Sequence, residues 1–208
     1  NFKREYARTG VVPIRRAHQV MAHLDTFLNT FVDSYGITEE ADGRLDPFLA
    51  SLQGQVQAHA DGPSNQLLTE VGDTAELLWT SAMTFAGMGE FDKQLCSLLN
   101  RAIRDDHPDL AASTAAMARS LNALCVVAPR GGAAAPEFPS GGITWRGTGF
   151  DDSLRDFFTE GKEYRVPGFL ATSFSRLKAR EFIYNEATAY GKPGVLWKVH
   201  VDPAGAQD

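Results

Sequence analysis

Residues 195–201 read VLWKVHV, and this stretch decides the fold class. Every second side chain is a valine or a tryptophan, a period that places Val195, Trp197 and the following valines on one face of a β-strand. Residues 143–147 (ITWRG) predict a second, short strand. Because both strands follow a long region with helical patterns, the sequence predicts an α+β protein with helices first and strands second.

The helical region is predicted from apolar side chains that recur every three or four residues. The clearest case is residues 18–35, where the apolar side chains share one face and Gly36 provides a stop. The next helix is predicted to have Asp46 as its N-cap and Pro47 in its first turn. Further helices are predicted at residues 65–83, 90–106, 111–125, 151–161 (capped by Asp151 or Asp152) and 175–187 (capped by Ser173 or Ser175), with an extended segment at 164–173.

Changes in composition along the chain predict where its domains begin and end. The turn-forming cluster at residues 61–65 (DGPSN) is the best candidate boundary. We therefore expect an N-terminal helical segment at 1–62 and a second domain at 63–208. Within the second domain we expect a helical subregion (63–127), a Gly-, Pro- and Ala-rich linker (128–142) and a strand core (143–208). The charged start of the sequence, with Asn1 in place of Met, is typical of a fragment or a processed chain.

The overall composition is that of a globular protein and excludes several function classes. The 208 residues are 43% hydrophobic, as in ordinary globular proteins. Their formal net charge of -6 argues against a nucleic-acid binder, which usually shows a basic stripe. No apolar run is long enough for a membrane span. The five histidines lack the spacing of a metal site, so no metal is expected. Cys96 and Cys125 are expected to be buried free thiols rather than a disulfide pair.

Arg146 is the residue that points most directly to a ligand. It interrupts a short apolar strand, where an unpaired guanidinium would be costly to bury. Its planar fork matches a phosphate or a carboxylate in a bidentate way, and Gly147 would let a ligand approach the backbone. The alternative is a strand-edge arginine that pairs with one of the many carboxylates of the chain.

The order of four segments resembles the arginine-serine-glutamate class of mono-ADP-ribosyltransferases, a family of vertebrate ecto-enzymes and bacterial toxins. The resemblance covers about residues 65–208 and implies an antiparallel β-sandwich core that is incomplete at its C-terminal end. The segments are LLNRAIRDD (98–106), Trp145-Arg146-Gly147, GFLATSFS (168–175) and GVLWKVHVDPAGAQD (194–208).

The resemblance implies that NAD is a substrate and that the chain transfers its ADP-ribose to a protein acceptor that carries an arginine. Arg146 would hold the NAD phosphates and the backbone of Gly147 would bind the nicotinamide carboxamide. Thr172 and Ser173 match the family's Ser-Thr-Ser stretch, which would make Ser173 a catalytic residue along with Arg146. Phe182 or Tyr184 would lie against the nicotinamide ring, although both would also suit the core of a helix.

Two departures from the family pattern bear on activity. Ala171 replaces the first serine of the Ser-Thr-Ser stretch, and a shifted match to Ser173 and Ser175 fits the preceding Gly168 less well. The family's catalytic glutamate lies in a strand beyond the one at 195–201, and no position of this sequence matches it. We therefore expect this chain by itself to be inactive.

Two other function classes compete with a transferase. Ala171 favours a catalytically silent NAD-fold module that acts through protein partners. The apolar stripe at 18–35 would suit a helical interaction protein whose function lies in residues 1–62, a segment that could also cap or inhibit the NAD cleft. The sequence leaves the compartment open between the cytoplasm and secretion as a toxin-like effector.

Overall fold

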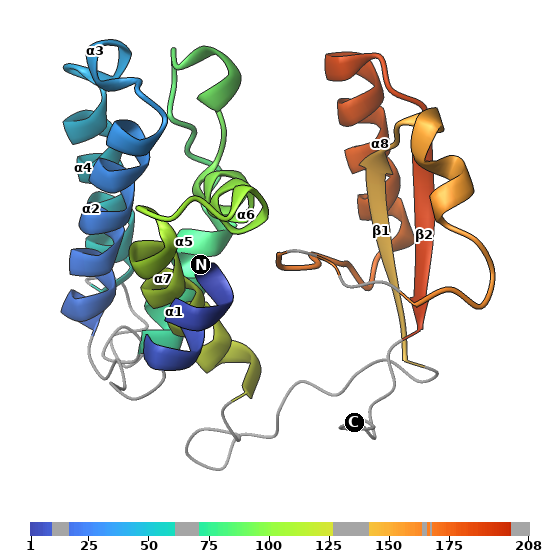
Figure 1. Ribbon diagram of the computed structural model, residues 1–208, viewed down its shortest axis with the longest axis horizontal. Helices are drawn as coiled ribbons and strands as arrows, with labels where there is room; N and C mark the ends of the chain where they lie inside the picture. The colour runs from blue at the N-terminus through green and yellow to red at the C-terminus, as the bar shows by residue number, and fades with distance from the viewer. Residues whose placement is uncertain (10–16, 61–70, 127–141, 164–165, 167, 201–208) are drawn as a thin grey trace. The chain divides into compact units, whose positions relative to one another are not determined.

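The computed structural model describes residues 1–9, 17–60, 71–126, 142–163, 166 and 168–200 (Figure 1). The chain divides into two compact units, Asn1–Arg130 and Gly131–Asp208. The first unit is helical and the second combines helix and sheet. The predicted α+β class with helices first is therefore confirmed.

Seven α-helices and one short 3-10 helix make up the described part of the first unit. Their order follows the predicted pattern, with one additional short helix at the start of the chain and another between the first two predicted helices. The elements are α1 (Phe2–Thr9), α2 (Ala17–Ser34), α3 (Thr38–Ala41), α4 (Leu45–Ala60), α5 (Val71–Thr80), η1 (Gly89–Phe91), α6 (Leu95–Asp105) and α7 (Ala111–Val126).

Helix α7 is central to the first unit because it packs against α1, α2, α5 and α6. Alanines line much of this helix, and their small side chains let the neighbouring helices approach closely. The apolar stripe of α2 supplies the largest buried side chains. Leu24, Phe27, Leu28 and Phe31 are all fully buried, so intramolecular packing accounts for the stripe seen in the sequence.

Two predicted helix starts differ from the structure. Helix α4 begins at Leu45, with the Phe48 N–H donating to the Arg44 carbonyl at 3.1 Å. Asp46 therefore lies inside the first turn and is not the N-cap. The Phe85 N–H donates to the Lys93 carbonyl at 3.0 Å, in a short antiparallel bridge that keeps the backbone before Leu95 out of the helix. Helix α6 therefore begins at Leu95 rather than at residue 90.

The second unit is a two-stranded antiparallel sheet with one α-helix packed on it. Strand β1 (Ile143–Gly149) pairs with β2 (Gly194–His200) from Ile143↔His200 to Gly149↔Gly194. The 3-10 helix η3 (Asp152–Phe157) follows β1, and its cap is Asp151, whose carboxylate accepts from the Ser153 N–H at 3.0 Å. Helix α8 (Arg176–Tyr190) contacts both strands.

The described part of the second unit buries few apolar side chains. Ala179 is the only hydrophobic residue in it that is almost fully buried, whereas the first unit has a large buried core. Among the described residues the sheet has two strands, so the predicted β-sandwich is not observed there. None of the described helices combines the length and the apolar character needed to cross a bilayer.

The predicted domain boundary at residue 62 lies outside the described residues, and so does nearly all of the predicted linker at 128–142. In the structure, helices α2 and α4 from the first predicted segment pack with α5 from the second. The division of the chain into compact units falls between residues 130 and 131, within the predicted linker. The functional division at residue 62 stays a prediction.

Candidate functional site

The outer edge of β1, opposite β2, gathers most of the predicted site residues. Trp145 and Ser173 form an isolated antiparallel bridge in which each N–H donates to the other's carbonyl at 2.8 Å. The chain at 171–173 therefore runs along the edge of β1, although 25 or more residues separate it from Arg146 in the sequence. The structure thus brings together two of the segments that carry the sequence resemblance.

The same bridge fixes the direction of the Gly147 backbone. Trp145 directs its N–H and C=O away from β2, and in an antiparallel ladder every second residue directs these groups the same way. The N–H and C=O of Gly147 therefore point to the outer edge of β1, beside Ala171. Within the described part of the chain, no backbone hydrogen bond pairs them with residues 168–173, so along this described segment the edge presents one donor and one acceptor that a ligand could use.

Arg146 lies between Trp145 and Gly147 on β1. Its guanidinium is held by the segment at 171–173, which runs along the outer edge of the strand. Its Nη1 donates to the carbonyl oxygen of Ala171 at 2.8 Å. The side chain is half-buried. In the register of the sheet Arg146 stands opposite Trp197, whose indole packs against the ring of Phe158 at a centroid distance of 5.1 Å. A cation and aromatic side chains therefore share one face of the sheet.

The α8 side of β1 explains why residue 147 is a glycine. A Cβ atom there would lie 1.7 Å from the carbonyl oxygen of Ala179 and 2.9 Å from a side-chain carbon of Ile183. Helix α8 can approach the strand this closely only because the side chain is absent. Since successive residues face opposite sides of a sheet, Arg146 points to the face away from α8.

Ser173 and Ser175 organise the turn that leads into α8. The Ser173 hydroxyl accepts from the Ser175 N–H at 3.1 Å, and the Ser175 hydroxyl accepts from the Lys178 N–H at 3.3 Å. Ser175 is thus the side-chain cap of α8. The proton of the Ser173 hydroxyl is still available for donation. Thr172 is exposed.

Phe182 and Tyr184 lie on α8, on the other face of the sheet from Arg146. Their exposed fractions are 58% and 72%, so neither belongs to the core in the described structure. The structure brings Arg146, Gly147, Thr172 and Ser173 to one edge of β1 but does not add these two rings to that group.

Two residues near this edge were not singled out from the sequence. Thr144 is buried, and its hydroxyl has no hydrogen-bond partner among the residues that the structure describes. It lies two residues before Arg146 and therefore on the same face of β1. Arg176 places its guanidinium 5.1 Å from the ring centre of Trp145, on the α8 face. The sequence offers one indication that Arg176 lies beside β1, which is that it directly follows the serine-containing stretch at 173–175.

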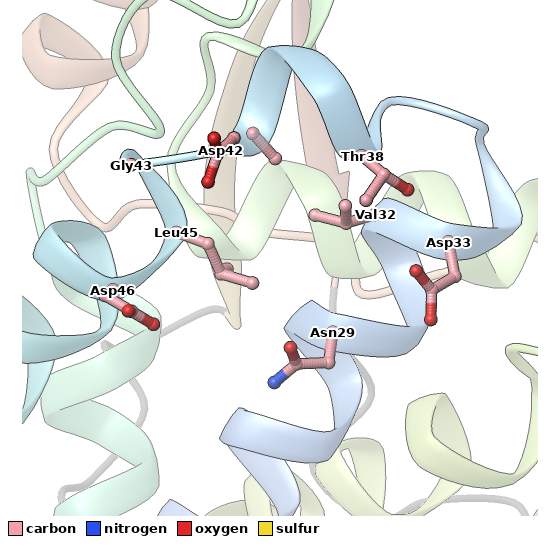
Figure 2. Close-up of a pocket in the computed structure, with 9 residues that line it drawn as sticks. Asn29, Val32, Asp33, Thr38, Asp42, Gly43, Leu45 and Asp46 are labelled. Atoms are coloured by element: carbon pink, nitrogen blue, oxygen red, sulfur yellow. The ribbon is translucent and has the colours of Figure 1, made fainter.

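The first unit contains a separate pocket of about 210 Å³ between the end of α2, α3 and the start of α4. Figure 2 shows Val32 and Leu45 near its middle, with the carboxylates of Asp33, Asp42 and Asp46 around them. All three carboxylates are exposed, and no other feature of the pocket indicates a ligand. In the described part of the chain, no three His, Cys, Asp or Glu side chains are grouped so that they could hold a metal ion.

Cys96 on α6 is a free, half-buried thiol, and burial raises its pKa above the ordinary value. The side chain of Cys125 lies outside the described residues. A raised thiol pKa means less of the nucleophilic thiolate at neutral pH, so the environment of Cys96 disfavours a role as a nucleophile.

No protein-family model, curated protein or solved structure matches this chain. The geometry at the edge of β1 and the sequence resemblance described above are therefore the two observations that bear on function.

Proposed function

We propose that the second unit belongs to an NAD-dependent mono-ADP-ribosyltransferase, and that the outer edge of β1 is its NAD site. The reaction breaks the bond between the nicotinamide nitrogen and the ribose and forms a bond from the ribose to a nitrogen of a protein arginine. Nicotinamide leaves, and the proton of the acceptor passes to a carboxylate. In this proposal the sheet is part of an antiparallel β-sandwich.

The observation that carries the proposal is the pairing of an open backbone edge with a guanidinium. A carboxamide carries one acceptor oxygen and two donor hydrogens, which complement the outward-facing N–H and C=O of Gly147. The guanidinium of Arg146 lies next to this edge and suits a diphosphate. Nicotinamide and diphosphate are parts of one ligand, so the two binding elements support NAD better than a simple anion.

Arg146 and Ser173 each have a defined task in the proposed complex. Arg146 would exchange its hydrogen bond to the Ala171 carbonyl for bonds to phosphate oxygens, using remote binding energy to orient the reacting bond. Ser173 accepts a hydrogen bond from Ser175 and would donate its own proton to the ribose. Nucleophilic attack also requires a carboxylate that stabilises developing positive charge, and no residue of this sequence matches the family's glutamate.

The decisive experiment is a calorimetric titration of the chain with NAD, because binding does not require the glutamate. Arg146→Ala removes charged hydrogen bonds worth about 1.5–3 kcal/mol each, so we expect affinity to fall by at least about tenfold. Arg155→Ala is the matched control, since it removes the same charge from η3, where Arg155 pairs with Asp152 at 2.7 Å. Equal NAD affinity in the parent chain and in Arg146→Ala would overturn the proposal.

Ala171 favours a second candidate function, a catalytically silent NAD-fold module that acts through protein partners. The residue supplies only a backbone carbonyl to Arg146, whereas a serine at this position would add a hydroxyl. The longest available form of the protein should be incubated with radiolabelled NAD and an arginine-rich acceptor protein. Transfer of label to the acceptor rules out the silent module, while NAD binding without transfer supports it.

A further inference from the structure

The exposed large hydrophobic residues of the described chain are confined to the second unit, where they fall into two groups. Leu154 and Phe157 in η3 form the first group. The second group belongs to residues 166–184, before and within α8. Exposed apolar side chains that gather in one segment indicate a surface that another body covers.

Charge separates the two groups. Residues 151–163 (DDSLRDFFTEGKE), which contain the first group, carry five acidic and two basic side chains. Residues 166–184 (VPGFLATSFSRLKAREFIY), which contain the second group, carry three basic side chains and one acidic side chain, Glu181. Within this basic stretch we define the α8 tip as the exposed residues Leu170, Phe174, Arg176, Leu177, Lys178 and Arg180.

We propose that the α8 tip binds the surface of an anionic lipid bilayer. Leu177, with 71% of its surface exposed, stands in the sequence directly between Arg176 and Lys178. Such a pattern lets apolar side chains enter the boundary between headgroups and acyl chains while the flanking cations reach lipid phosphates. Each cation near an anionic surface adds about 1 kcal/mol, a factor of about five in affinity.

A bilayer fits the α8 tip better than a protein partner does. A protein would have to offer apolar pockets ringed by carboxylates at matching positions, whereas mobile lipids rearrange around any pattern of cations. Lys178 pairs with Glu181 at 2.7 Å, but an exposed pair of this kind contributes little. The lysine can therefore exchange this carboxylate for a lipid phosphate.

The test is co-sedimentation of the full 208-residue chain with phosphatidylcholine vesicles that contain or lack phosphatidylserine. We expect binding only when phosphatidylserine is present, and weaker binding as salt concentration rises. Arg180→Gln should weaken binding about fivefold and Leu177→Gln roughly tenfold. The controls Arg155→Gln and Leu154→Gln make the same changes in η3 and should leave binding unchanged.

Three results would overturn the proposal. The first is equal binding to both kinds of vesicle, and the second is an equal loss in the η3 controls. The third is a dimer of the parent chain in sedimentation velocity that Leu177→Gln converts to a monomer, because a second copy would then cover the α8 tip. Arg180→Gln keeps every apolar side chain, so it tests the proposal even if Leu177→Gln perturbs α8.

Discussion

Replacing Gly147 with alanine tests whether α8 depends on the missing side chain at this position. The added Cβ would lie 1.7 Å from the carbonyl oxygen of Ala179, far inside van der Waals contact. The backbone of Gly147 is ordinary strand, so alanine meets no conformational obstacle there. In a strand interior alanine should otherwise be favoured over glycine by about 0.5–1 kcal/mol. Any loss of stability must therefore come from the close approach of α8.

The expected loss is about 3 kcal/mol, the upper part of the range for overpacked sites, because the obstructing atom belongs to the backbone and cannot rotate away. Gly194→Ala is the matched comparison. Its Cβ would lie 2.1 Å from Cγ2 of Ile183, a side-chain atom that can move, so the loss should be about 1 kcal/mol. Ile183→Ala should relieve the clash of Gly194→Ala but leave Gly147→Ala obstructed by the Ala179 carbonyl.

Hydrogen exchange followed by mass spectrometry reports each unit of the chain separately. Peptides from β1 should lose protection strongly in Gly147→Ala and weakly in Gly194→Ala. Peptides from α7 in the same sample provide the internal reference, since they belong to the other compact unit. The double variants with Ile183→Ala complete two thermodynamic cycles, which isolate the coupling between each glycine and the isoleucine.

Unchanged protection of β1 in Gly147→Ala would refute the packing argument, because a clash with a backbone carbonyl cannot be absorbed without moving α8. Full rescue of Gly147→Ala by Ile183→Ala would also refute it, since the obstacle would then be the isoleucine side chain.

Three further predictions concern the helical unit. Phe27→Ala removes a fully buried ring and should cost about 3–5 kcal/mol in chemical denaturation, without lowering hydrogen-exchange protection at residues 143–149. Gly54→Ala adds a methyl group within α4, and the new Cβ would have no atom from another part of the fold within 4 Å. The substitution should raise stability by about 0.5–1 kcal/mol; a lower melting temperature would contradict this. Burial and the carboxylate of Asp105 raise the pKa of Tyr35 to about 12. The raised pKa stabilises the folded chain fully below pH 10, and this contribution is lost as pH rises toward 12. The free energy of unfolding should therefore fall between pH 10 and pH 12 in the parent chain, and this fall should disappear in Tyr35→Phe.

The helical stripes could be predicted from sequence because burial follows helical spacing directly. In the predicted apolar face of residues 18–35, six side chains are buried and two, Met21 and Tyr35, are half-buried. The start of α6 was missed for a local reason. Asp92 accepts from the Gly87 N–H at 3.0 Å, and such contacts between side chain and backbone compete with a helix in ways that periodicity does not reveal.

The candidate site was predictable where a residue type conflicted with its surroundings. Arg146 stood out because a cation rarely belongs in an apolar strand, and the structure gives it a specific backbone partner. Phe182 and Tyr184 raised no such conflict, since an aromatic residue suits a helix core, a stacking site or an exposed face equally well. Their position on the far side of the sheet from Arg146 depends on how α8 docks, which spacing along the chain does not encode.

Gly147 shows how one residue can satisfy both a structural and a ligand-binding requirement. The contact with α8 uses the space where a side chain would be, while the proposed contact with nicotinamide uses the N–H and C=O at the edge of the strand. These groups point in perpendicular directions in a β-strand, so neither role excludes the other. Substitution at this position alters both, and lost NAD binding in Gly147→Ala would not identify the cause. The backbone contact is better tested through the ligand: an NAD analogue that lacks the carboxamide should bind the parent chain more weakly, with β1 protection unchanged.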